Sequence, residues 1–223
     1  MTEYGFAFPD ISQEAYACRA DIEDMVNVIA DLSNLKHFAQ SGSEIQSASE
    51  IRSALDRDES LLLYQMHLSD WTIFHERYIY SDFLYILRND LQTLSQRIAD
   101  SAVGFSLTDT GDYACYWHYK NGILTDKLEQ LYEKARGYEE RELTGEFIDY
   151  LFENEPDFIV DGYFHYISSS EGIDKIYPIN QRERDKNSFA LTQRFMESEK
   201  IFIFDPEDLS FPHTNWVILR ADL

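Results

Sequence analysis

Six histidines are the residues of this chain best suited to ligate a metal ion or to transfer a proton. They occupy positions 37, 67, 75, 118, 165 and 213, and no two lie within five residues of each other. His118 and His165 each precede a tyrosine in a predicted strand, but Lys120 and Ile167 stand where paired-histidine phosphoesterase motifs require a hydroxyl residue. The spacing therefore predicts no metal site, no catalytic residue and no cofactor.

Paired carboxylates are the other groups able to hold a cation such as Mg²⁺ or Ca²⁺. Three such groups occur, and each is also explained by turns, helix ends or loops in an acidic chain: Asp109 with Asp112, Glu153 with Glu155 and Asp157, and Asp205 with Asp208. Cys115 and His118 lie three positions apart on a predicted strand, so their side chains point to opposite faces and cannot form a nucleophile and base pair. The common nucleotide-binding, hydrolase and zinc signatures are absent, namely GxGxxG, GxxxxGK[ST], GxSxG, HExxH and CxxC.

Tyr116 and His118 belong to a predicted strand over residues 113–120. The alternation of a strand places Cys115 and Trp117 on one face, which we expect to face the core, and Tyr116 and His118 on the other. The second face also includes Lys120 at its polar end. We expect this face to be partly exposed and to form the floor of a shallow groove. Tyrosine is common at interfaces, so Tyr116 and His118 are candidate contacts for a partner.

Net charge is the strongest compositional feature. The chain has 41 acidic and 19 basic residues, a formal charge of −22 over 223 residues. Such a field disfavours direct binding to nucleic acid or to an anionic membrane and attracts basic proteins, although solubility or adaptation to salt would give the same balance.

The acidic residues concentrate between residues 139 and 174, and no lysine or arginine occurs from Gly145 to Gly162. If residues 145–154 are helical, three of the carboxylates share one face, where like charges repel unless a partner opposes them. The candidate partner-binding residues are therefore Glu146, Asp149, Glu153, Glu155, Asp157, Asp161, Tyr116 and His118.

The first third of the chain predicts a helix and a hairpin. Apolar residues recur at helical spacing from Ile11 to Leu32, with Asp10 as the cap and an acidic opposite face. This helix is expected to pack on the core, or alternatively to form a dimer seam. A short helix around Ile45 to Leu55, capped by Ser43, and a hairpin of residues 60–68 and 71–79 follow.

The centre of the chain predicts a helix followed by a meander. The helix begins at Ser81 and runs to Ile98, and strands are expected over residues 103–107 and 113–120. Asn121-Gly122 predicts a tight hairpin turn, after which the pattern returns to helix from Leu128 to Gly137. Later elements are a helix from Thr144, strands over 157–168 and 175–179, a short helix over 189–196, and closing strands over 200–204 and 215–220.

These elements predict an α+β fold, with an antiparallel or mixed sheet built from hairpins and a meander and with helices packed on one face. We expect residues 1–142 to form a helical start plus a strand, helix and meander unit, and residues 143–223 an α+β part that either stands apart or joins the same domain. Cys18 and Cys115 are expected to be buried free thiols, and the lack of a signal peptide or of a long apolar stretch predicts a cytoplasmic protein without membrane contact.

The leading functional hypothesis is a non-catalytic interaction protein that binds or neutralises a basic protein, as an immunity protein, an antitoxin or a nucleic-acid mimic does. The first alternative is a metal-dependent hydrolase whose site the fold assembles from scattered Asp, Glu and His residues near Tyr116 and His118. The second is a structural or oligomerisation module, in which the first helix forms a homodimer.

Overall fold

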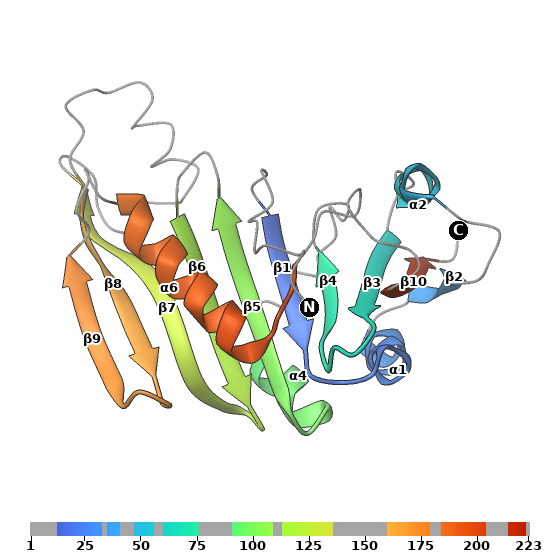
Figure 1. Ribbon diagram of the computed structural model, residues 1–223, viewed down its shortest axis with the longest axis horizontal. Helices are drawn as coiled ribbons and strands as arrows, with labels where there is room; N and C mark the ends of the chain where they lie inside the picture. The colour runs from blue at the N-terminus through green and yellow to red at the C-terminus, as the bar shows by residue number, and fades with distance from the viewer. Residues whose placement is uncertain are drawn as a thin grey trace.

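In the computed structural model, the described residues are 13–32, 35–40, 47–55, 60–75, 91–108, 113–135, 160–178, 184–203 and 214–221. Their strands form one ten-stranded sheet with the order β2-β10-β3-β4-β1-β5-β6-β7-β8-β9, and every described pairing is antiparallel (Figure 1). The strands are β1 (Gln13–Cys18), β2 (Leu35–Gln40), β3 (Ser60–Met66), β4 (Thr72–His75), β5 (Ser101–Thr108), β6 (Tyr113–Lys120), β7 (Ile123–Ala135), β8 (Val160–Ser168), β9 (Ile173–Pro178) and β10 (Thr214–Ala221). The helices are α1 (Ile22–Leu32), α2 (Ala48–Leu55), α4 (Leu91–Arg97) and α6 (Arg184–Glu199).

The strands β5 to β9 follow one another in the sheet as they do in the chain. The β6–β7 turn is the predicted hairpin, because Asn121 and Gly122 have φ angles of 48° and 80° and Lys120 pairs with Ile123. Positive φ at both central positions is what a type I′ turn requires. The meander predicted at this place in the sequence is confirmed.

The other half of the sheet is built from distant segments. β1 lies between β4 and β5, and β10, the last described strand of the chain, lies between β2 and β3. Strands from both sides of residue 142 thus belong to one sheet. The division of the chain into two parts stays a prediction.

The helices cover both faces of the sheet, so the expectation of helices on one face alone is not confirmed. α1 and α4 pack against one face through residues that include Met25 and Leu94. α2 and α6 pack against the other through Ile51, Phe195 and Met196. Figure 1 shows α6 across the near side of the meander and α4 behind it. Successive strand residues alternate between these two cores, as the pleat requires.

The predicted first helix is wrong over its first half, because residues 13–18 form β1 and α1 begins only at Ile22. Ala15 and Ala17 belong to one core, and Tyr16 and Cys18 to the other. A strand buried on both faces is continuously apolar, so its side chains also satisfy a helical spacing. The α1 part of the prediction is correct.

The predicted helix from Leu128 is also wrong, because β7 continues as a strand to Ala135. Leu128 pairs with Tyr116 of β6 on one side and with Tyr166 of β8 on the other. β7 pairs with β6 over residues 123–128 and with β8 over residues 126–135, so ladder hydrogen bonds extend along the whole strand and outweigh the helical spacing of its apolar residues.

The predicted strand over residues 200–204 is not a strand in its described part. Lys200 has a φ of 59°, its N–H donates to the carbonyl of Glu197, and the Ile201 N–H donates to the carbonyl of Met196. This pair of bonds is the Schellman ending of α6. It turns the chain so that Ile201 and Ile203 are buried in irregular backbone.

The remaining predictions are largely confirmed where residues are described. The β3–β4 hairpin, the strands β8, β9 and β10, and α6 are present, with α6 longer than expected. α2 is capped by Ser47 rather than by Ser43, through reciprocal bonds with Glu50. The start of the helix predicted from Ser81, the turn at residues 109–112 and the helix from Thr144 lie outside the described residues. None of the described helices is long and apolar enough to span a bilayer.

Candidate functional site

Most of the predicted acidic contacts fall where the structure gives no description. Five of them lie outside the described residues: Glu146, Asp149, Glu153, Glu155 and Asp157. Asp161 lies on β8, where its backbone pairs with Lys134 of β7. Their role in partner binding stays a prediction.

Tyr116 and His118 are buried, with exposed fractions of 1% and 5%, so the expected partly exposed groove floor is wrong. Phe195 of α6 covers both residues. Its ring stacks on Tyr116 at a centroid distance of 4.2 Å and an interplanar angle of 11°, and it tilts against His118 at 5.4 Å. The opposite side of β6 is covered as well, because Trp117 packs against the core that contains α4. Both faces of this strand are core.

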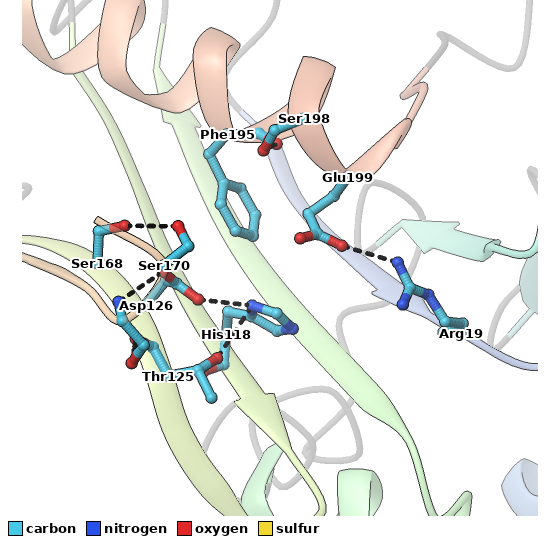
Figure 2. A network of polar contacts seen from close by, with 10 residues as sticks. Arg19, His118, Thr125, Asp126, Ser168, Ser170, Phe195, Ser198 and Glu199 are labelled. Carbon is cyan, nitrogen blue, oxygen red and sulfur yellow. Dashed lines mark hydrogen bonds and ion pairs between the residues drawn. The ribbon is translucent and has the colours of Figure 1, made fainter. Parts of the chain in front are cut away.

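The His118 side chain is held by two neighbours on β7. Its Nδ1 lies 3.1 Å from Asp126 Oδ2 and 3.1 Å from Thr125 Oγ1 (Figure 2). The β6–β7 register shifts between Tyr119 and His118, so that Tyr119 pairs with Leu124 while His118 pairs with Asp126. Thr125 is the extra residue of this β-bulge, and both β7 side chains therefore reach one imidazole nitrogen.

Asp126 is bound at both carboxylate oxygens. Oδ2 faces His118, and Oδ1 accepts a hydrogen bond of 3.1 Å from the backbone N–H of Ser169. Burial by itself would raise the pKa of Asp126, but hydrogen bonds from His118 and neighbouring hydroxyls, together with the charge of His118, lower it overall. The carboxyl group is therefore ionised at neutral pH and only accepts hydrogen bonds.

This geometry fixes the proton of the neutral His118 ring on Nδ1, because an ionised carboxylate needs a donor. Nε2 then carries the lone pair. Nε2 is buried and has no hydrogen-bond partner among the residues that the structure describes, and the side chain is only 6% exposed. An imidazole oriented in this way has the electronic form of a general base or a metal ligand, but Phe195 and the sheet close it off from solvent. Among the residues that the structure describes, no group of three His, Cys, Asp or Glu side chains is placed to hold a metal ion.

A second polar cluster secures the C-terminal end of α6 on the same face of the sheet. Arg19 donates to Glu199 at 2.7 Å, and its guanidinium carbon lies 4.8 Å from the ring centre of Trp71. The Trp71 indole N–H donates to the backbone carbonyl of Glu199 at 2.8 Å. The Trp71 N–H thus satisfies one free carbonyl at the end of the helix, and the charge of Arg19 lies at the end where the helix dipole favours a cation. Figure 2 shows the Arg19–Glu199 ion pair and the His118–Asp126 pair near the same part of α6.

A cluster of exposed acidic side chains within the described residues lies on α1 and the residue before it. Asp21, Glu23, Asp24 and Asp31 are exposed, and the helix contains no lysine or arginine. The buried stripe of Ile22, Met25 and Ile29 fixes this surface to the sheet. The acidic face that the sequence predicts for the first helix is present on α1.

Sequence reasoning missed Asp126 and Thr125 as partners of His118. A regular two-residue hairpin at Asn121-Gly122 would place Thr125 opposite His118. No residue in the sequence indicates the β-bulge that brings Asp126 to His118 as well. The turn motif was thus enough to suggest Thr125, but not the carboxylate.

Comparison with protein-family models, with curated proteins and with solved structures gives no match for this chain.

Proposed function

We propose that the protein binds a basic protein partner through its acidic surface and does so without catalysis, in the manner of an immunity protein, an antitoxin or a nucleic-acid mimic. The observation that carries the proposal is the net charge of −22 together with an α1 surface that has four exposed carboxylates and no cation in the helix. A field of this sign attracts a basic protein over a distance of about 8–10 Å at physiological salt and speeds its encounter.

The position of Asp31 supports a role beyond helix stability. Glu23 and Asp24 lie in the first turn of α1, where the helix dipole favours negative charge. Asp31 is exposed near the other end, where the dipole disfavours a carboxylate by about 0.3–1 kcal/mol and the last turn holds no basic residue. Stability explains the first two acids but not the third, whereas a basic partner would favour all three.

Burial of Tyr116 and His118 supports the non-catalytic part of the proposal. A substrate would need to displace Phe195 to reach the His118 ring, and Phe195 contacts two other buried rings at the same time. We also propose a cytoplasmic location, in which the buried free thiols of Cys18 and Cys115 remain reduced.

The proposal is tested by capture at low salt followed by a binding measurement with the captured protein. The α1 variant carries Asp24→Asn and Asp31→Asn, and the matched control carries Asp174→Asn and Glu197→Gln, which remove the same charge from exposed positions elsewhere. We expect a basic protein to be captured, to be released by salt, and to bind the α1 variant several-fold more weakly than the control.

A third variant, with Glu146→Gln, Asp149→Asn and Glu153→Gln, asks whether the acidic block contributes as well. Circular dichroism and urea unfolding show that each variant is folded before binding is compared. Capture of proteins that are not basic, or binding that is insensitive to salt, would refute the proposed function. Equal weakening by the α1 variant and its control would remove α1 from the interface.

A metal-dependent hydrolase is the second candidate, and the observation in its favour is the oriented Nε2 of His118, which has no partner within the described part of the chain. Its test is hydrolysis of p-nitrophenyl phosphate and p-nitrophenyl acetate with added Mg²⁺, Mn²⁺ or Zn²⁺. An activity that disappears in His118→Ala and persists in His165→Ala would support it, since His165 forms a comparable but more exposed pair with Asp174. Absence of metal-dependent turnover would reject it.

A further inference from the structure

The turn between β3 and β4 presents a leucine in an unfavourable conformation. Leu68 has a φ of 69° and an exposed fraction of 106%, so its side chain is surrounded by solvent. A left-handed conformation is unfavourable for a residue other than glycine because of its β-carbon, and glycine or asparagine would fit this turn better. Leu68 buries no apolar surface in return, so the fold itself gains nothing from a leucine here.

The turn is nevertheless firmly held. Buried Gln65 accepts a hydrogen bond of 3.2 Å from the first N–H of α1, at Ile22, and donates one of 2.9 Å to the carbonyl of Ser69. The Ser69 N–H closes the turn on the Met66 carbonyl at 3.0 Å, and the Ser69 hydroxyl oxygen accepts from the Trp71 N–H at 3.1 Å. The exposed leucine is thus displayed on a pre-organised turn that is tied to the start of α1, which lowers the entropy cost of binding there.

A groove of about 640 Å³ lies beside this turn. Its lining includes Asp21 before α1, Met66, His67 and Leu68 from the β3–β4 turn, and Asn215 from β10. Among the described residues, the lining contains a carboxylate and no lysine or arginine. It therefore combines an apolar wall with one negative charge and several hydrogen-bonding groups.

This chemistry fits a side chain that has an apolar stem and a cationic head. The stem of an arginine or lysine can lie along Leu68 and Met66 while its head reaches the Asp21 carboxylate. An anionic ligand would meet Asp21 and the acidic first turn of α1. We propose that this groove receives an arginine or lysine side chain from a basic protein partner, an inference that rests on the proposed function and deepens it.

The direct test is a ¹⁵N–¹H NMR titration of the folded protein with Nα-acetyl-arginine amide, with Nα-acetyl-glutamate as the anionic control. We expect saturable shifts of the amide signals of Asp21, Leu68 and Ser69 with the arginine derivative alone. Asp21→Asn should weaken its affinity about three-fold, the size of a surface ion pair, and leaves an N-capping residue in place. Asp31→Asn removes the same charge from the other end of α1 and should have no effect.

The apolar wall is tested with Leu68→Asn, which suits a positive φ and should not destabilise the turn. We expect this variant also to weaken binding of the arginine derivative, whereas Ile123→Asn, at another exposed apolar residue, should not. No saturable shift at the groove, equal shifts with the glutamate derivative, or an equal effect of Asp31→Asn would each overturn the inference.

The two proposals can fail separately. If the captured basic partner binds wild type in a salt-dependent way and binds the Asp21 and Leu68 variants equally well, the groove is wrong while the proposed function stands. If no basic partner binds wild type at low salt, the proposed function fails whatever the groove does with the arginine derivative.

Discussion

Replacing Asp126 with asparagine tests the buried His118–Asp126 pair. The substitution keeps the shape of the side chain, and the amide oxygen can still accept the hydrogen bond from the Ser169 N–H. The oxygen that faced His118 Nδ1 is replaced by an NH₂ group. In the wild type the Nδ1–H donates to a charged carboxylate oxygen, whereas in the variant the Nδ1–H and the NH₂ group are both donors. The imidazole can relieve this conflict by moving its proton to Nε2, but that atom is buried and no described residue accepts a hydrogen bond from it.

The expected cost follows from these two alternatives. Loss of a hydrogen bond to a charged group costs about 1.5–3 kcal/mol, and a buried donor left unpaired costs about 1–3 kcal/mol. Only one of the two applies at a time, so we expect Asp126→Asn to lower the free energy of unfolding by about 2–3 kcal/mol at pH 7. His118→Ala should lose part of the same energy, and the double variant should cost less than the sum of the two single losses.

The pH dependence supplies an independent check. The pKa of Asp126 in the folded protein lies below its ordinary value of 3.8. The contribution of its ionised form to stability is therefore present above about pH 4 and is lost as the pH falls through the folded pKa. The difference in unfolding free energy between wild type and Asp126→Asn should accordingly be smaller below pH 4 than at pH 7.

The protein contains its own control in the His165–Asp174 pair. His165 Nε2 lies 2.8 Å from Asp174 Oδ1, but the Asp174 side chain is 73% exposed. Exposed ion pairs contribute about 0–1 kcal/mol, so Asp174→Asn should change the urea midpoint little. Urea unfolding followed by tryptophan fluorescence, at pH 7 and again below pH 4, measures all variants. The reasoning is refuted if Asp126→Asn costs no more than Asp174→Asn at pH 7, or if its cost does not diminish in acid.

Three further outcomes are expected. Phe195→Ala should lower the free energy of unfolding by about 3 kcal/mol, because the ring is buried. Phe38→Ala, at a residue 48% exposed, should cost less than about 1 kcal/mol in the same urea titration, and comparable losses would contradict the assigned burial. Gly122→Ala should cost more than about 1 kcal/mol, because the residue has a φ of 80° and a β-carbon there would meet the Gln96 side chain, and a variant as stable as wild type would argue against the type I′ turn. Burial raises the pKa of the Cys18 thiol well above its usual range, so Cys18 should resist iodoacetamide in the folded protein and react once urea unfolds the chain. Peptide mass spectrometry measures the labelling, and rapid labelling of the native protein would mean that β1 is accessible.

Local chemistry made part of the fold predictable from the sequence. Asn121-Gly122 set the β6–β7 turn, because few residues other than asparagine and glycine adopt positive φ readily. The polar turn residues between β3 and β4 likewise marked a hairpin, and the acidic side of α1 was visible as charge opposite an apolar stripe. In each case the information lay within a few consecutive residues.

What failed depended on neighbours far away in the chain. Residues 13–18 fit a helix by spacing and became a strand because β4 and β5 flank them and helices cover both faces of the sheet. The exposure of Tyr116 and His118 was mispredicted for a related reason, since the side chain that covers them, Phe195, comes from α6 near the end of the chain. An alternation pattern shows that two faces exist, but it does not show which of them another element will cover.

The order of the ten strands leaves β2 and β9 as the two outer strands of the described sheet, and an unpaired strand edge is a surface on which further chains can polymerise. Both strands carry features that oppose such growth. The pairing of β2 with β10 shifts register between Ile218 and Leu219, which bends the edge, and β2 exposes Lys36. β9 ends at Pro178, which has no N–H to donate to another strand. Each outer strand thus carries a feature that disfavours pairing with the edge of another copy, the step by which such a sheet would extend into fibres.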